Sequence, residues 1–139
     1  PGNFFDLTRY RPTLSRENGE SKLDIPNTVI TGGRQPGSHD FLFLRLLEPH
    51  ALAEEYVESV LALFKKVGVK RYCLIGSMYD MVPYTRPLMI TGSGSTLGLQ
   101  NSLDLEQVVS SDYQGPTSML SLIAQKALEL GIETCSLIV

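Results

Sequence analysis

Apolar residues recur at helical spacing in two long segments of the chain. Within 51–67 and 117–130 they fall every three or four positions, which places them on one face of a helix. We therefore expect helices over 51–67 and 117–130, each with one buried face. The apolar positions are Leu52, Ala53, Tyr56, Val57, Val60, Leu61, Phe64 and Val67 in the first segment, and Met119, Leu120, Ile123, Ala124, Ala127 and Leu128 in the second.

Each of these segments is followed by a glycine and then by a short apolar run. Gly68 and Gly131 stand where a residue in the left-handed conformation commonly ends a helix. The runs at 70–76 and 133–139 have the length and apolar character of buried strands. Because each helix leads directly into a strand, the sequence predicts β-α-β units with a parallel core.

Other parts of the chain carry weaker strand and turn signals. Asn18-Gly19 is typical of a two-residue hairpin turn, and prolines and glycines separate the later runs. The expected strands are 28–32, 41–47 and 88–92, with weak edge strands at 12–17 and 21–25 and a short helix or turn at 103–109.

Together these elements predict one α/β domain over residues 1–139. Residues 1–26 would form an extended arm with a hairpin, and 27–139 would hold the sheet and helices. The two apolar helix faces and the repeated helix-glycine-strand order favour a three-layer α/β domain with a mostly parallel or mixed sheet. Its expected buried residues are Val57, Val60, Leu61, Phe64, Ile75, Ile123, Ala127 and Leu137.

Composition narrows the class of protein. The chain has 139 residues, 42% hydrophobic and 19% charged, with a formal net charge of -3, so its overall charge gives no reason to expect nucleic acid or an anionic membrane as partner. No apolar run approaches the roughly 20 residues of a membrane span. Cys73 and Cys135 lie in apolar runs and are expected to be reduced core residues rather than a disulfide or metal pair. We expect a cytoplasmic protein.

Two segments invite functional interpretations that the sequence does not favour. Residues 4–12 alternate aromatic and charged side chains, as single-stranded nucleic-acid sites do. In an acidic chain, a loop whose aromatics plug the core is favoured. Gly32-Gly33-Arg34 lacks both the Gly-Lys-Ser/Thr of a phosphate loop and the spacing of a dinucleotide fingerprint. His39 is expected to be a turn residue, and His50 has no visible metal partner, so no metal site is expected.

The stretch from Gly76 to Gly94 is the strongest candidate for a site. It follows an apolar strand, and ligands of open α/β sheets bind where strands end at their carboxyl edge. Pro83 and Pro87 restrict the backbone on either side of Tyr84-Thr85-Arg86. A proline at 116, placed at the first position of the second helix, would leave free N–H groups there for an anion. The candidate binding residues are Gly76, Ser77, Asp80, Pro83, Thr85, Arg86, Thr91, Gly92, Ser93, Gly115 and Thr117.

This stretch supports two interpretations. In the first, Arg86 and nearby backbone N–H groups hold a phosphate or carboxylate. In the second, which is favoured, Arg86 pairs with Asp80 and locks the loop. No catalytic residues are predicted, because Ser77 lacks the Gly-x-Ser-x-Gly elbow of a nucleophile and no histidine lies in the loop.

The order of several motifs resembles the proteasome assembly chaperone family in its prokaryotic branch. Gly76-Ser77 followed by Val82-Pro83-Tyr84-Thr85-Arg86-Pro87, a strand and Thr91-Gly92 looks like the family's central motif. The resemblance covers most of the chain, because counterparts occur in order on both sides of that motif. They are Phe5-Asp6-Leu7-Thr8-Arg9-Tyr10-Arg11-Pro12, Pro36-Gly37-Ser38-His39-Asp40, Leu47-Glu48-Pro49 and Tyr113-Gln114-Gly115-Pro116-Thr117.

This resemblance implies a fold and a function. The fold would be an α/β/α sandwich similar to phosphorylases and hydrolases of the purine nucleoside phosphorylase and peptidyl-tRNA hydrolase type. The function would be that of a non-catalytic protein-interaction module, a homo-oligomer with a protein partner and no cofactor. The alternative is a phosphorylase- or hydrolase-like enzyme, or a binder of phosphate or a nucleoside, that uses the 76–94 loop.

The resemblance also bears on the ends of the chain. Family members usually have a strand and helix before the segment at Phe5 and more helix after the last strand here. The chain stops on the apolar Leu137-Ile138-Val139, and an incomplete fragment of the full domain is expected. The hydrophobic-Tyr-x tail with which some archaeal relatives bind proteasomes is not seen at this end.

Overall fold

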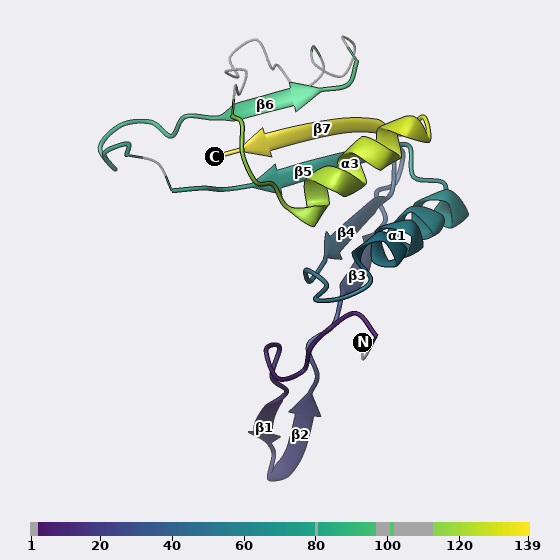
Figure 1. The fold of residues 1–139 in the computed structure, drawn as a ribbon, viewed down its shortest axis with the longest axis vertical. Coiled ribbons are helices and arrows are strands. Elements are labelled where there is room, and N and C mark those ends of the chain that lie inside the picture. Colours follow the sequence, from purple (N-terminus) through teal and green to yellow (C-terminus); the bar gives the residue numbers. More distant parts are fainter. Residues whose placement is uncertain (1–2, 80, 97–100, 102–112) are drawn as a thin grey trace. The chain divides into compact units, whose positions relative to one another are not determined.

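A computed structural model describes residues 3–79, 81–96, 101 and 113–139 (Figure 1). The chain divides into two compact units, 1–56 and 57–139, and one helix continues from the first into the second. The fold is mixed α/β. Its elements are β1 (Thr13–Glu17), β2 (Glu20–Asp24), β3 (Val29–Gly33), β4 (Phe41–Arg45), α1 (Ala53–Val67), β5 (Arg71–Gly76), β6 (Thr91–Gly94), α3 (Met119–Glu129) and β7 (Glu133–Ile138).

The first unit contains two antiparallel hairpins. β1 pairs with β2 across Asn18 and Gly19, whose φ values of 52° and 85° suit the two-residue turn that the sequence predicts. β3 pairs with β4, and in the part of the chain that the structure describes these two strands pair only with each other. Within the described residues, the strands predicted at 28–32 and 41–47 therefore lie outside the sheet of the later strands, in contrast to the single predicted sheet.

Aromatic side chains form the core of the first unit. Phe5 and Tyr56 are both 5% exposed, and their rings pack edge to face with centroids 5.8 Å apart. Phe4 packs against the same Tyr56 ring at 5.4 Å, and the Tyr56 hydroxyl lies 2.7 Å from Thr28 Oγ1. At Phe5, the prediction that the aromatics of residues 4–12 fill a core is confirmed.

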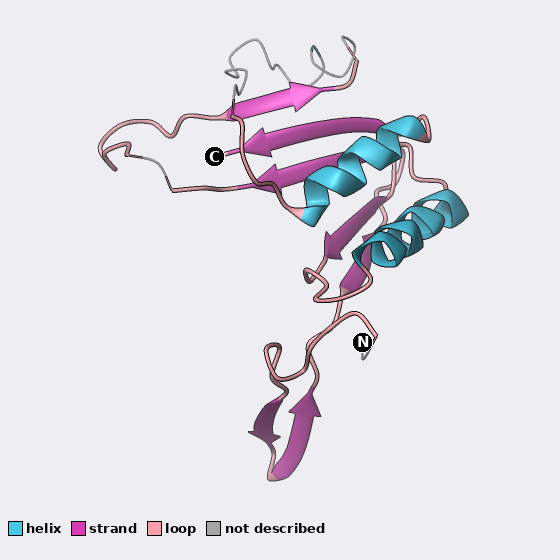
Figure 2. Ribbon diagram, in the orientation of Figure 1, coloured by secondary structure: helices cyan, strands magenta, loops and turns pink. Residues whose placement is uncertain are grey.

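The second unit contains a three-stranded mixed sheet in the order β5-β7-β6. β5 and β7 are parallel, as predicted, and β6 is antiparallel to β7. α3 lies against β5 and β7 (Figure 2). Tyr72 of β5 is buried between these elements, with its ring 5.6 Å from that of Phe64 in α1 and its hydroxyl 3.4 Å from the Leu120 carbonyl.

α1 and α3 end in the same way. Gly68 and Gly131 have φ values of 73° and 75°, the left-handed conformation that their positions predict. After α1, Val69 N–H donates to the Phe64 carbonyl at 3.0 Å, and after α3 Ile132 N–H donates to the Ala127 carbonyl at 3.1 Å. These bonds satisfy carbonyls that a helix end leaves free and turn the chain directly into β5 and β7.

The helix and strand boundaries differ from the predicted ones at several places. β6 covers 91–94 instead of 88–92, because Thr91-Gly92-Ser93-Gly94 makes the backbone ladder to β7 and the apolar residues before it lie outside the ladder. α3 begins at Met119 after the cap residue Ser118, so Pro116 does not occupy its first position. The element expected at 103–109 falls outside the described residues.

Six of the eight residues expected in the core are buried, and two are not. Ile75 is 74% exposed, and Leu137 is only partly buried. Burial alternates along β5, with Tyr72 inside and Arg71, Cys73 and Ile75 exposed. β5 is therefore a half-buried strand. Its continuous apolar run predicts that both faces are buried, but only the face with Tyr72 is.

Tyr72 makes stability depend on alkaline pH. Burial raises the pKa of Tyr72 from 10.0 to about 12. Below pH 10 the phenol is protonated in both the folded and the unfolded chain; above it, only the unfolded chain readily releases the proton. We therefore expect Tyr72 to lower the free energy of unfolding by about 2–3 kcal/mol between pH 10 and pH 12.

Urea melts at pH values across that window test this expectation in wild type and Tyr72→Phe. Cys135, whose pKa is also raised to about 12 by burial, titrates in both proteins and so cancels in the comparison. The Phe variant should lose less stability than wild type as the pH rises. Equal losses in the two proteins would show that the Tyr72 phenol is solvated.

Candidate functional site

The end of β5 is tied to the end of β7 by backbone hydrogen bonds. Val139 N–H donates to the Gly76 carbonyl at 3.0 Å, and Met78 N–H donates to the Val139 carbonyl at 3.0 Å. Gly76 lies opposite Ile138, and a Cβ on residue 76 would approach Ile138 Cδ1 to 3.0 Å. The loop that follows β5 therefore starts from a fixed root at the carboxyl edge of the sheet.

β6 brings three of the predicted site residues to the same edge. Thr91 pairs with Ile138 and its hydroxyl lies 3.5 Å from the Ile138 carbonyl. Ser93 Oγ lies 3.0 Å from Ser136 Oγ, and Gly92 stands between them in the strand. Gly76 and Thr91 thus flank Ile138 from its two neighbouring strands, and the polar side chains of β6 are engaged with β7.

The loop between β5 and β6 contains a hydrogen-bonded turn. Arg86 N–H donates to the Pro83 carbonyl at 2.9 Å, which closes a turn over Tyr84 and Thr85. Ser77, Pro83, Thr85 and Arg86 are all exposed. Asp80, the predicted partner of Arg86, lies outside the described residues, and among those described no side chain pairs with Arg86.

The predicted residues before α3 make contacts within their own segment. The Thr117 hydroxyl donates to Ser121 Oγ at 2.7 Å, and the Tyr113 hydroxyl donates to the Pro116 carbonyl at 3.0 Å. The Tyr113 ring lies over Gly115, where a Cβ would come 2.5 Å from the tyrosine oxygen. A binding role for Gly115 and Thr117 remains a prediction.

Sequence reasoning missed the most conspicuous property of the loop, which is its exposed apolar surface. Tyr79, Met81 and Tyr84 are 106%, 99% and 97% exposed, so their side chains lie almost wholly in solvent. We call the described residues of 75–90, which include the last two residues of β5, the apolar loop; Figure 1 shows it reaching beyond the carboxyl ends of β5 and β7. Its exposed large apolar residues are Ile75, Met78, Tyr79, Met81, Tyr84, Leu88, Met89 and Ile90.

The signal that could have revealed this surface is the absence of any periodicity. Apolar residues in 78–90 follow neither the helical nor the strand repeat, and Pro83 and Pro87 interrupt them. An apolar stretch that no regular element can turn inward is left at the surface unless a loop folds over it. Pro83 and Pro87 predict a restricted backbone but not the exposure of the apolar side chains around them.

Arg86→Ala is expected to leave the free energy of unfolding within about 0.5 kcal/mol of wild type. The Arg86 side chain is exposed, and no described residue pairs with it. Its removal therefore leaves no buried group without a hydrogen-bond partner. Urea denaturation followed by circular dichroism measures the effect. A loss on the order of 2 kcal/mol would instead favour the predicted lock between Arg86 and Asp80.

A cavity in the first unit is the second candidate for a functional site. A cavity of about 360 Å³ is lined by Asn3, Phe4, Phe5, Asp6, Arg9, His50 and Ala51. His50 Nδ1 accepts a hydrogen bond of 3.2 Å from Asp6 N–H, and hydrogen bonds from Thr8 lower the pKa of the Asp6 carboxyl. His50 thus serves as an acceptor that ties the N-terminal segment down. Among the described residues no cluster of three or more His, Cys, Asp or Glu is placed to hold a metal ion.

No described helix is long and apolar enough to cross a membrane. The sequence model of the PAC2 family matches residues 2–139. Among curated proteins, none matches the chain.

Several solved structures are similar to this one. A PAC2 family protein from Streptomyces avermitilis is 26% identical with a TM-score of 0.82, over 99% of this chain and 58% of its own. A Mycobacterium tuberculosis proteasome-assembly chaperone homologue is 21% identical with a TM-score of 0.81, over the same shares. Pyrococcus furiosus PbaA, an archaeal homolog of proteasome-assembly chaperone, is 15% identical with a TM-score of 0.62, over 97% and 56%.

At 21% and 15% identity, the Mycobacterium tuberculosis and Pyrococcus furiosus structures show a similarity of fold only. The chain spans 58% of the length of the first two of these structures.

Proposed function

Because the chain belongs to the PAC2 family, we propose that it is a non-catalytic protein-interaction module of the assembly-chaperone type. Two of the structures that share its fold are described as homologues of a proteasome-assembly chaperone, and the proposal extends that description to this chain. The proposal includes a homo-oligomer in the cytoplasm, with protein rather than nucleic acid or membrane as partner. It also includes one domain over 1–139 within a three-layer sandwich of the phosphorylase/hydrolase-like kind.

The observation that carries this proposal is the apolar loop. This loop exposes eight large apolar residues, and large exposed apolar patches on soluble proteins mark interaction sites. Aromatic and methionine side chains, which this loop presents, are enriched where proteins meet. Tyr79 and Tyr84 are the strongest candidates to dominate binding, because almost all of their surface is in solvent and tyrosine is enriched among the residues that carry interface energy.

The fixed root of the loop supports the same conclusion. The bonds between Gly76, Met78 and Val139 hold its start against β7, and the Thr91 ladder holds its end. A binding segment that is anchored on both sides loses less conformational freedom on association than a free one. The turn at Pro83 restricts it further.

Site-specific photo-crosslinking in the native host tests the proposal. A photoreactive phenylalanine analogue is placed at Tyr84 of the full-length protein, and at Leu14 of the β1–β2 hairpin as control, since Leu14 is also an exposed apolar residue. We expect a discrete protein, or a second copy of the chain, to be captured at position 84 and not at position 14. Absence of a protein adduct at 84, or the same adducts at both positions, would contradict the proposal.

A thermal-shift screen separates this function from the alternative of a small-molecule binder. Phosphate or a nucleoside that binds the native state must raise the melting temperature. We expect no shift, because the Thr91 and Ser93 hydroxyls at the sheet edge already contact β7. A shift that disappears in Arg86→Ala would favour the small-molecule site.

A further inference from the structure

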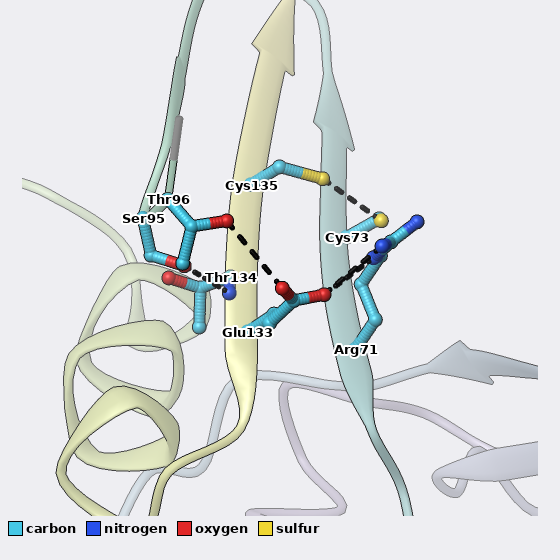
Figure 3. Close-up of polar contacts among 7 residues, drawn as sticks. All are labelled: Arg71, Cys73, Ser95, Thr96, Glu133, Thr134 and Cys135. Carbon is cyan, nitrogen blue, oxygen red and sulfur yellow. Dashed lines mark hydrogen bonds and ion pairs between the residues drawn. The ribbon is translucent and has the colours of Figure 1, made fainter. Parts of the chain in front are cut away.

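Cys73 and Cys135 face each other across the parallel pair β5–β7 (Figure 3). They are 62 positions apart in sequence but are register partners in the sheet. The Cys135 thiol donates a hydrogen bond to the Cys73 sulfur at 2.8 Å, and both are free cysteines. The prediction that both are core residues holds for Cys135 and is wrong for Cys73, which is exposed.

Register pairing of Cys73 with Cys135 meets the distance requirement of a disulfide. Neighbouring strands lie about 4.7–4.9 Å apart, and disulfides join Cα atoms about 4.4–6.8 Å apart. Register partners on adjacent strands also point their side chains to the same face of the sheet. Closing a bond between these two sulfurs therefore needs side-chain rotation and no shift of the strands.

An ion pair holds the two strands in this register. Arg71 and Glu133 are register partners two residues before the cysteines, and Arg71 Nε and Nη2 both donate to Glu133 Oε2, at 3.2 and 2.9 Å. Glu133 Oε1 accepts a further bond of 3.4 Å from the Thr96 hydroxyl (Figure 3). A strand slip of one residue would separate the cysteines and break this pair together.

The two sulfurs differ in access, and this gives them different roles. Cys73 is exposed, whereas Cys135 is 4% exposed. Burial raises the pKa of Cys135 to about 12, which keeps it a thiol at neutral pH. Because the thiolate is the nucleophile in exchange and must reach its target, Cys73 is the attacking group and Cys135 the resolving one.

We propose that Cys73 and Cys135 form a thiol–disulfide exchange site that reacts with low-molecular-weight disulfides. The Cys73 thiolate attacks one sulfur of a disulfide RSSR, which forms the mixed disulfide on Cys73 and releases RS⁻. Cys135 passes its proton to RS⁻ as its sulfur attacks that of Cys73, which closes the Cys73–Cys135 bond and releases the second RS⁻. The protein loses two electrons and two protons, and RSSR takes up both to give two RSH.

The test incubates the full-length protein with mixtures of reduced glutathione and glutathione disulfide, followed by alkylation and mass spectrometry. We expect wild type to lose two hydrogens and both reactive thiols, to carry one intramolecular bond, and to regain the thiols with dithiothreitol. Its urea midpoint should be higher when oxidised, since the bond closes a long loop. Two free thiols at every ratio, or bonds between chains, would overturn the proposal.

Two variants test the assignment of roles. Cys135→Ala should accumulate a glutathione adduct on Cys73, and Cys73→Ala should be modified at least about tenfold more slowly, because its remaining sulfur is buried. Equal or reversed rates would overturn the assignment. If either variant fails to fold by circular dichroism, peptide mapping of acid-quenched wild type decides, because the first adduct must appear on Cys73.

Discussion

Phe64→Ala is expected to lower the free energy of unfolding by about 3–5 kcal/mol, the usual cost of removing a buried aromatic ring. Phe64 is 1% exposed and its ring packs 5.6 Å from that of Tyr72. The ring therefore joins α1 to the sheet of the second unit, and alanine would leave a cavity between them. Urea denaturation followed by circular dichroism measures the loss.

Val67→Ala is the matched control for this prediction. Val67 ends the same helix but is 50% exposed, so truncation there should cost a few tenths of a kcal/mol, at most about 0.5. Leu61→Ala, on the buried face of the same helix, should cost about 2–5 kcal/mol, well above the cost of Val67→Ala. A cost below about 1 kcal/mol for Phe64→Ala would mean that α1 does not pack on β5 as described.

Phe5→Ala is expected to lower the free energy of unfolding by a similar amount, about 3–5 kcal/mol. Its ring contacts both Tyr56 and Tyr10, at centroid distances of 5.8 and 5.9 Å, and is 5% exposed. The first unit has few other buried side chains among its described residues, so the loss removes much of its core. Urea melts of the full-length protein measure it.

Tyr56→Phe and Leu14→Ala serve as controls for the Phe5 prediction. Tyr56→Phe keeps the ring contacts and loses only the 2.7 Å contact with Thr28, which should cost about 1 kcal/mol. Leu14 is 67% exposed, and its truncation should have little effect. If Phe5→Ala were no more costly than Leu14→Ala, the N-terminal segment would not be part of a packed core.

Local patterns in the sequence predicted the elements that depend on local physics. The apolar face from Val57 to Phe64 has the helical period, so it determined both α1 and its buried side. Gly68 and Gly131 ended the helices because a left-handed residue is needed there. The parallel pairing of β5 and β7 followed from the short helix-to-strand connections on either side.

What the sequence could not predict depends on contacts between distant segments. The burial of Cys135 but not Cys73 is set by their neighbours in the sheet, and both sit in similar apolar runs. The apolar run at 88–90 would suit a strand, yet the hydrogen-bonded pairing with β7 begins only at Thr91. There Gly92 and Gly94 lie opposite Leu137 and Cys135. The exposed side of Ile75 likewise reflects which face of β5 the helix α3 covers.

The affinity of the full-length protein for the protein captured at position 84 tests the central claim most directly. Titration calorimetry compares wild type with the double variant Tyr79→Ser/Tyr84→Ser and with Leu14→Ser. If the apolar loop is the binding surface, the double variant binds at least about 100-fold more weakly, since aromatic residues dominate such interfaces. Leu14→Ser should bind as wild type does. Unchanged affinity in a folded double variant would contradict the assignment of the loop as the binding surface.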